Sequence, residues 1–169
     1  ICSFWGPACS ACTHLHMWQL WNKRGAPLPG PTQGSASVAS AEAAVSQADI
    51  VVTATTSEVP VFDRTALKSG THINAMGANA ASRMEIDPLI VKNCAWIATD
   101  DVEQARVEAG EFRALGDAFD WTRLRPLSDL VVHGLAQRQA SDVTLYKSLG
   151  AGLEDLAAAS ALYDQLNAS

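Results

Sequence analysis

Apolar and polar positions alternate in blocks along the chain from about residue 38 onward, and each block has the length of one strand or one short helix. Residues 49–54, 72–76 and 95–99 are short apolar runs, typical of strands that are buried on both faces. Residues 41–47, 64–67 and 101–109 read as short helices between those runs. This alternation of strand and helix predicts an α/β fold with a parallel sheet.

The boundaries of these segments carry capping signals. Ser40 stands before the first helix, where its side chain can accept an orphan backbone N–H, and Glu42 follows in the first turn. Gly70 is placed to close the second helix. Acidic residues also open the segment 101–109, which supports a helix there.

The last third of the chain reads as mostly helical. Residues 115–135 predict helical pieces around Pro126, and residues 145–166 predict one long helix with a possible break at residues 150–152. Leu149, Leu153 and Leu156 form an apolar stripe on that helix. Such a stripe is normally core and less often an interface, so we expect an exposed apolar face here unless a partner covers it.

Small polar residues follow the predicted strand at residues 72–76. Residues 71–87 read THINAMGANAASRMEID, in which an apolar run breaks at Gly77. In parallel sheets ligands bind beyond the carboxyl ends of strands, and a glycine there lets the backbone approach a ligand closely. Gly77 is therefore a candidate for ligand contact, with a plain turn glycine as the alternative.

The first 37 residues differ from the rest of the chain. Residues 25–35 are rich in Pro and Gly and exclude a helix, and this region also holds three of the five Trp and three of the four Cys. The bias indicates a truncated or out-of-frame start, or else a divergent flexible loop.

Composition places the chain among ordinary soluble domains. It has 169 residues, 48% of them hydrophobic, and a formal net charge of −6. The acidic balance argues against nucleic acid or an anionic membrane as partner, no segment is apolar enough for a membrane span, and the cytoplasm is the expected compartment.

Four cysteines are too few for a secreted disulfide framework. Cys9 and Cys12, followed by His14 and His16, invite a zinc or redox interpretation, but no second ligand pair follows, so we predict no metal site.

Three separated blocks, at residues 48–57, 71–87 and 142–157, together resemble the ornithine cyclodeaminase/mu-crystallin family in order and wording. The resemblance extends from residue 48 to about residue 166, and members of that family are roughly twice this length. It implies a Rossmann-like, doubly wound parallel sheet, incomplete at its N-terminal edge, with a long C-terminal helix. The expected divisions are a degraded start at 1–37, the nucleotide-binding domain at 38–143 and the C-terminal helix at 144–169, which returns toward a missing N-terminal domain.

The resemblance also implies a set of cofactor contacts. Thr55, Thr56 and Ser57 would contact adenosine or diphosphate, Met76 and Gly77 would lie against nicotinamide, and Ser148 would close over its carboxamide. Thr and Ser at strand ends also often cap backbone groups, and Ser148 could equally be such a residue.

The position of the family's phosphate loop is poorly preserved. The matching positions are Gly6, Ala8, Ser10 and Ala11, with Ala8 in place of the second glycine and Pro7 removing a donor. We therefore expect the isolated chain to bind cofactor weakly or not at all, and to be inactive alone.

At the position of the second strand, Asn22 and Arg24 occur without the acidic residue that binds a ribose 2′-hydroxyl. The cations Lys23 and Arg24 could meet a 2′-phosphate, which favours NADP over NAD.

The family's cyclodeaminases carry a Gly-x-Asp-x-x-x-Lys arrangement, and this chain has Asn79 and Arg83 at those catalytic positions. An amide cannot act as a general base, which disfavours cyclodeaminase chemistry. Arg83 could hold Asn79 or an anionic substrate, or simply pair with Glu85 at the surface.

The predicted function is that of a fragment of an NAD(P)-dependent oxidoreductase, of imine (ketimine) reductase or amino-acid dehydrogenase type, acting on small amino- or imino-acids and homodimeric at full length. The alternatives are an ornithine cyclodeaminase and a non-catalytic nucleotide-binding remnant.

Overall fold

The computed structural model describes residues 38–134 and 138–167. The predictions for residues 1–37, which concern the phosphate loop, the thiols, the Pro/Gly-rich segment and the incomplete sheet edge, lie outside the described residues.

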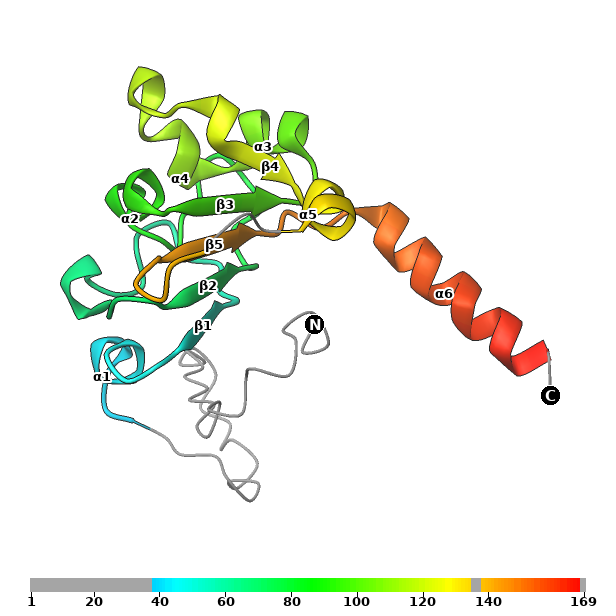
Figure 1. Ribbon diagram of the computed structural model, residues 1–169, viewed down its shortest axis with the longest axis horizontal. Helices are drawn as coiled ribbons and strands as arrows, with labels where there is room; N and C mark the ends of the chain where they lie inside the picture. The colour runs from blue at the N-terminus through cyan, green and yellow to red at the C-terminus, as the bar shows by residue number, and fades with distance from the viewer. Residues whose placement is uncertain (1–37, 135–137, 168–169) are drawn as a thin grey trace.

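Five parallel strands form the sheet of the described chain. They are β1 (Ile50–Thr53), β2 (His72–Ala75), β3 (Trp96–Thr99), β4 (Leu124–Pro126) and β5 (Thr144–Lys147). Their order across the sheet is β1-β2-β5-β3-β4, and every neighbouring pair is parallel. Figure 1 shows the strands side by side with helices around them. The prediction of an α/β, Rossmann-like parallel sheet is confirmed.

The helices are mostly short. They are α1 (Ala41–Val45), α2 (Pro88–Asn93), α3 (Val102–Glu108), α4 (Gly110–Arg113), α5 (Leu127–His133) and α6 (Gly152–Asn167), with 3-10 turns η2 (Arg64–Ala66), η3 (Gly116–Ala118) and η4 (Trp121–Arg123). Ser40 caps α1 by accepting the amide of Ala43, as predicted, and Asp101 caps α3 by accepting that of Gln104.

The two faces of the sheet differ in how they are covered. Ile73, Leu145 and Ile97 stand in register on β2, β5 and β3, and all three are buried in the hydrophobic core. That core continues into α2, α3 and α4 through residues such as Val91 and Phe112. On the opposite face, the residues one position earlier on each strand line an open cavity, so residues 38–134 and 138–167 cover this face less.

Two predictions for the last third of the chain are wrong. Residues 144–147 are the central strand β5 instead of the start of a helix, and the helix begins only at Gly152. The possible break at residues 150–152 is present, and Gly150 there has a φ of +81°. Apolar residues at helical spacing continue from Leu145 through Leu149 to Leu153, and this spacing concealed the strand before the break. The sheet domain therefore extends past residue 143 to Lys147.

The segment 115–135 also contains a strand that was not predicted. Residues Leu124–Pro126 form β4 beside β3, and only α5 after them is a regular helix. Proline is tolerated here because β4 is an edge strand of the described sheet and ends at Pro126.

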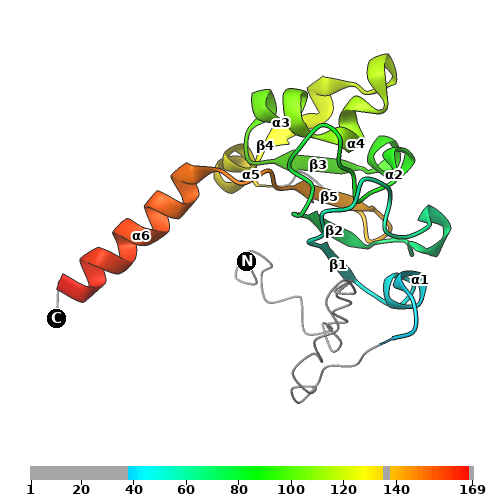
Figure 2. The ribbon, with the colours of Figure 1, turned by 180° about the vertical axis from the view of Figure 1, so that it is seen from behind.

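The long C-terminal helix is confirmed, and α6 projects away from the sheet (Figures 1 and 2). Its residues are exposed, with Leu153 at 76% and Leu166 at 79%. The expected exposed apolar face is thus present. Within the described residues, no helix combines the length and the hydropathy that a membrane span requires.

Candidate functional site

The carboxyl ends of β1, β2 and β5, where the chain exits the sheet into loops, lie side by side. Thr53, Ala75 and Lys147 are register partners at the last position of each strand. The amide of Met76 donates to the carbonyl of Thr53 at 2.8 Å, and the amide of Ser148 donates to that of Ala75 at 2.9 Å. Three separated candidate segments, residues 55–57, 76–77 and 148, therefore leave the sheet beside one another.

A buried carboxylate joins the first two of these loops. Glu85 is fully buried, and its Oε2 accepts the amides of Gly77 at 2.7 Å and Ala78 at 3.1 Å. Its Oε1 accepts the amide of Thr55. The prediction of a surface ion pair between Arg83 and Glu85 is therefore wrong, because backbone amides occupy the carboxylate instead.

Gly77 is required by the approach of one loop to the other. A Cβ at this position would lie 2.1 Å from both the amide nitrogen and the carbonyl oxygen of Thr55, and 2.6 Å from Oε1 of Glu85. The space that Gly77 leaves on this side is filled by the chain itself. The lack of a side chain at Gly77 thus allows the two loops to pack against each other, whereas contact of Gly77 with a cofactor stays a prediction.

A buried ion pair lies directly behind the loops. Nζ of Lys147 is 3.4 Å from Oε1 of Glu111, and both side chains are 1% exposed. The same ammonium donates to the carbonyl of Ala78, and Oε1 of Glu111 also accepts the amide of Glu85 at 3.0 Å. The β5 strand is thereby connected to the β2 exit loop and to Glu85.

A second carboxylate fixes the loop after β5. Oδ2 of Asp100, at the end of β3, accepts the hydroxyl of Ser148 at 2.9 Å and the amides of Leu149 at 2.8 Å and Gly150 at 3.0 Å. Its Oδ1 accepts the hydroxyl of Tyr146. Burial and the neighbouring Asp100 carboxylate raise the pKa of Tyr146, so this phenol stays protonated as a donor.

Most of the predicted hydroxyl contacts already have a partner within the chain. The Thr55 hydroxyl accepts the amide of Ser57, the Ser57 hydroxyl donates to the carbonyl of Val59, and the Ser148 hydroxyl donates to Asp100. Thr56 is exposed, and its side chain makes no hydrogen bond to residues 38–134 or 138–167. Of the four predicted hydroxyls, that of Thr56 is thus the one most accessible to a ligand.

The β2 exit loop presents an apolar and an amide group to solvent. Met76 is 45% exposed, and Asn79 two residues beyond Gly77 is also exposed. Arg83 is half-buried farther along the same loop. A thioether surface and an amide beside a strand exit are groups that fit the apolar ring face and the carboxamide of a nicotinamide.

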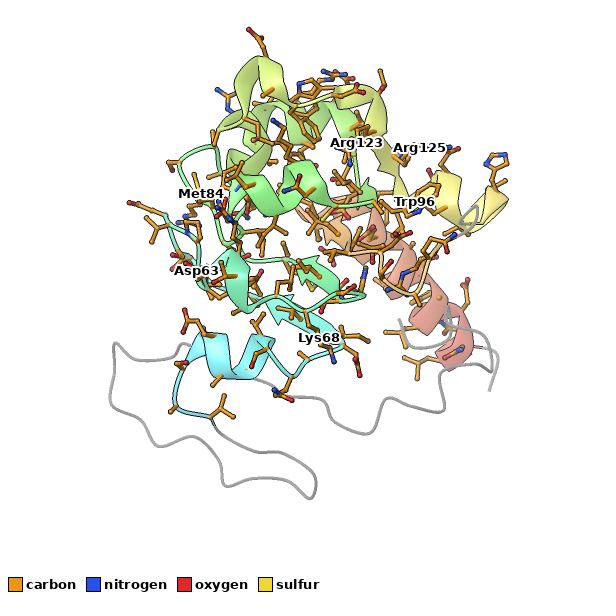
Figure 3. All side chains as sticks on the ribbon, turned by 60° about the vertical axis from the view of Figure 1, so that its left-hand side comes forward. Asp63, Lys68, Met84, Trp96, Arg123 and Arg125 are labelled. Carbon is orange, nitrogen blue, oxygen red and sulfur yellow. The ribbon has the colours of Figure 1, made fainter. Side chains whose placement is uncertain are left out.

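A cavity of about 510 Å³ lies on the less covered face of the sheet. It is lined by residues of β2, β5 and β3, by α5 and by Glu154, and Met76 after the end of β2 is also part of its lining. Trp96, labelled in Figure 3, lies beside α5 on this face. Burial lowers the pKa of His72 on the cavity wall, while its hydrogen bond with Asn74 raises it in part.

The sequence interpretation did not identify Glu85, Glu111 or Asp100 as parts of the site. Two of them carried a sequence signal, because Asp100 directly follows β3 and Glu111 directly follows Gly110, where a carboxylate can accept backbone amides. Glu85 lies well beyond the end of β2 and carried no such signal. Gly110 itself touches the β2 exit loop, since a Cβ there would lie 2.1 Å from the carbonyl oxygen of Arg83.

Comparison with known proteins bears on this arrangement. The model of the ornithine cyclodeaminase/mu-crystallin family matches residues 33–169, which is most of the chain. The chain belongs to the ornithine cyclodeaminase/mu-crystallin family. The resemblance inferred from its three sequence blocks is thus confirmed.

One relative is the ketimine reductase mu-crystallin of Macropus fuliginosus, 32% identical over 151 residues, with 89% of this chain and 46% of the relative covered. Among solved structures, a probable ornithine cyclodeaminase from Bordetella pertussis Tohama I matches with a TM-score of 0.72 and 30% identity, over 79% of this chain and 43% of that one. The chain thus spans less than half the length of these family members.

A third similar protein was solved with ligands. The Δ1-pyrroline-2-carboxylate reductase of Thermococcus litoralis, in complex with NADH and L-proline, matches with a TM-score of 0.63 and 27% identity. The match covers 69% of this chain and 37% of that one.

Proposed function

We propose that this chain forms the nucleotide-binding part of an NAD(P)-dependent reductase that acts on the C=N bond of small imino acids. The observation that carries the proposal is the convergence of the β1, β2 and β5 exits, with Asn79 exposed beside them. Two of the similar proteins, the ketimine reductase and the pyrroline-carboxylate reductase, carry names of this reaction class.

The chemistry of Asn79 favours reduction over ammonia elimination. Its amide can donate and accept hydrogen bonds but cannot take a proton from water at neutral pH. A bound reduced nicotinamide supplies the hydride in this reaction class. An iminium substrate already carries its proton on nitrogen, so the chain's residues have only to bind the two reactants and orient them.

Three of the predicted segments would hold the dinucleotide. Thr56 offers its hydroxyl at the β1 exit, Met76 its exposed side chain at the β2 exit, and the loop from Ser148 closes the third side. Arg83 would assist Asn79 or meet the substrate carboxylate. Lys23 and Arg24 motivate a preference for NADP, and we propose a cytoplasmic homodimer for the protein at its relatives' length.

Two other functions have specific support. A cyclodeaminase is suggested by the similarity to the probable ornithine cyclodeaminase of B. pertussis. A nucleotide-binding protein without turnover is suggested by Asn79 and Arg83, which replace the catalytic aspartate and lysine of the family's cyclodeaminases.

The three functions give different results in one assay. A version extended to its relatives' length is supplied with NADPH and Δ1-pyrroline-2-carboxylate, or with ornithine and NAD, and both NADPH oxidation and ammonia are measured. We expect NADPH oxidation and background ammonia. Asn79→Asp should leave reduction within a small factor, because Asn79 orients the substrate only. Rapid ammonia release with Asn79 intact would favour the cyclodeaminase, and saturable NADPH binding without either activity would favour the binder.

A further inference from the structure

We infer that Glu85 is a positioning residue for the dinucleotide site, holding the β1 and β2 exit loops at the separation that the cofactor needs. The inference rests on the proposed function. Glu85 itself does not face the candidate ligand groups, since its side chain is fully buried and its oxygens are occupied by backbone amides.

The two oxygens of this carboxylate serve different loops. Oε1 accepts the amide of Thr55, the residue before the exposed Thr56. Oε2 accepts the amides of Gly77 and Ala78, which lie between the exposed Met76 and Asn79. The three exposed candidate residues, Thr56, Met76 and Asn79, are thus positioned through their neighbours by the side chain of Glu85.

Glu85 is in turn held from behind. Its own amide donates to Oε1 of Glu111, which pairs with Nζ of Lys147, and that ammonium donates to the carbonyl of Ala78. The contacts form a closed circuit through Glu85, Glu111, Lys147 and Ala78. The β2 exit loop is therefore fixed to β5 through Ala78, the β1 exit loop is fixed to it through Glu85, and a preorganised site needs such support.

A carboxylate is the side chain that this position requires. Both oxygens accept, and three amide donors converge on them. A glutamine has one acceptor oxygen and one NH₂ group, so in either orientation its NH₂ would face an amide N–H. Glu85→Gln should release one loop while preserving side-chain size, and aspartate preserves both acceptors on a shorter stem.

The test compares cofactor affinity among variants of this chain. Dissociation constants for NADPH and NADH come from titrations followed by ¹⁵N amide shifts, and unfolding free energies from urea melts. The variants are Glu85→Gln, Glu85→Asp and, as a control, Val45→Ala, which removes core contacts in α1 away from the loops. We expect the dissociation constant to rise at least about tenfold in Glu85→Gln, less in Glu85→Asp, and not at all in Val45→Ala despite its lower stability.

The outcomes distinguish a failure of the positioning role of Glu85 from a failure of the proposed function. Equal affinity in folded Glu85→Gln and wild type, or the same loss in Val45→Ala, would overturn the positioning role. If Glu85→Gln does not fold, Glu85→Asp decides, and unchanged affinity there overturns the role as well. If the wild-type chain binds neither dinucleotide, the same variants are compared in the version extended to its relatives' length. If that version also binds neither at millimolar concentration, the proposed function fails first and this inference with it.

Discussion

Replacing Gly77 with alanine probes the contact on which the arrangement of the two loops depends. The added Cβ would lie 2.1 Å from the amide nitrogen and the carbonyl oxygen of Thr55, whereas real Cβ atoms essentially never come within 3.0 Å of such atoms. The backbone must therefore move by close to 1 Å, and that movement also pulls Thr55 from Oε1 of Glu85.

The expected cost of Gly77→Ala has two parts. Overpacking typically costs about 1–3 kcal/mol. A hydrogen bond to a charged group contributes about 1.5–3 kcal/mol. Because the two are not additive, we expect the unfolding free energy to fall by about 3 kcal/mol and the melting temperature by roughly 10 °C.

The assay is urea and thermal unfolding followed by far-UV circular dichroism, with Gly152→Ala as the matched control. Nothing lies within 4 Å of a Cβ at Gly152, and the residue begins α6. Alanine there should leave stability unchanged or raise it by up to about 1 kcal/mol. A Gly77→Ala protein within about 0.5 kcal/mol of wild type would refute the close approach of the loops, because overpacking of a rigid contact costs at least about 1 kcal/mol.

Three further predictions concern other groups. Burial raises the pKa of the Cys94 thiol from 9.0 to about 12. The contribution of this thiol to stability is therefore complete below pH 9.0 and is lost as the pH rises from there toward the raised pKa. The stability advantage of wild type over Cys94→Ala should shrink by about 1.4 kcal/mol between about pH 8 and about pH 10, and a constant difference would contradict this. Burial lowers the pKa of His72, so its ring should titrate by NMR with a midpoint below 6.5, and a midpoint above that value would contradict the buried placement. Asp100→Ala removes the acceptor of the Leu149 and Gly150 amides, so hydrogen exchange at both should accelerate while that of the Thr55 amide does not, and unchanged exchange at Gly150 would show that Asp100 does not hold this loop.

Local signals were sufficient to predict most of the fold. The apolar runs that form β1, β2 and β3 are short and bounded by polar residues, and Ser40 and Asp101 cap helices as their types predict. These features depend on neighbours in sequence, so reading along the chain recovers them.

The failures occurred where long-range pairing decides the structure. Residues 144–147 become a strand because β2 and β3 lie on either side of them, and that neighbourhood has no local signature. The short strand β4 is likewise defined by its pairing with β3.

The sequence predicted which segments form the candidate site, but it did not predict the buried carboxylate that holds them together. Gly77 was identified from the end of a predicted strand, whereas Thr55, Met76 and Ser148 were identified from the family resemblance. All four do leave the sheet together. Glu85 read as a surface charge because an Arg-x-Glu pattern is usually solvated, and its burial follows only from amides of two other segments converging on it. Whether these residues contact a cofactor stays a prediction.

The most direct test of a dinucleotide site at this edge is an amide map of the ¹⁵N-labelled chain titrated with NADPH and with NADH to millimolar concentration. The account predicts saturable shifts at residues 55–57, 76–79 and 148–150, larger or at lower concentration with NADPH, and small shifts in α6. Shifts confined to the cavity face at Trp96 and α5 would contradict it. So would the lack of any saturable shift with either dinucleotide both in this chain and in the version extended to its relatives' length.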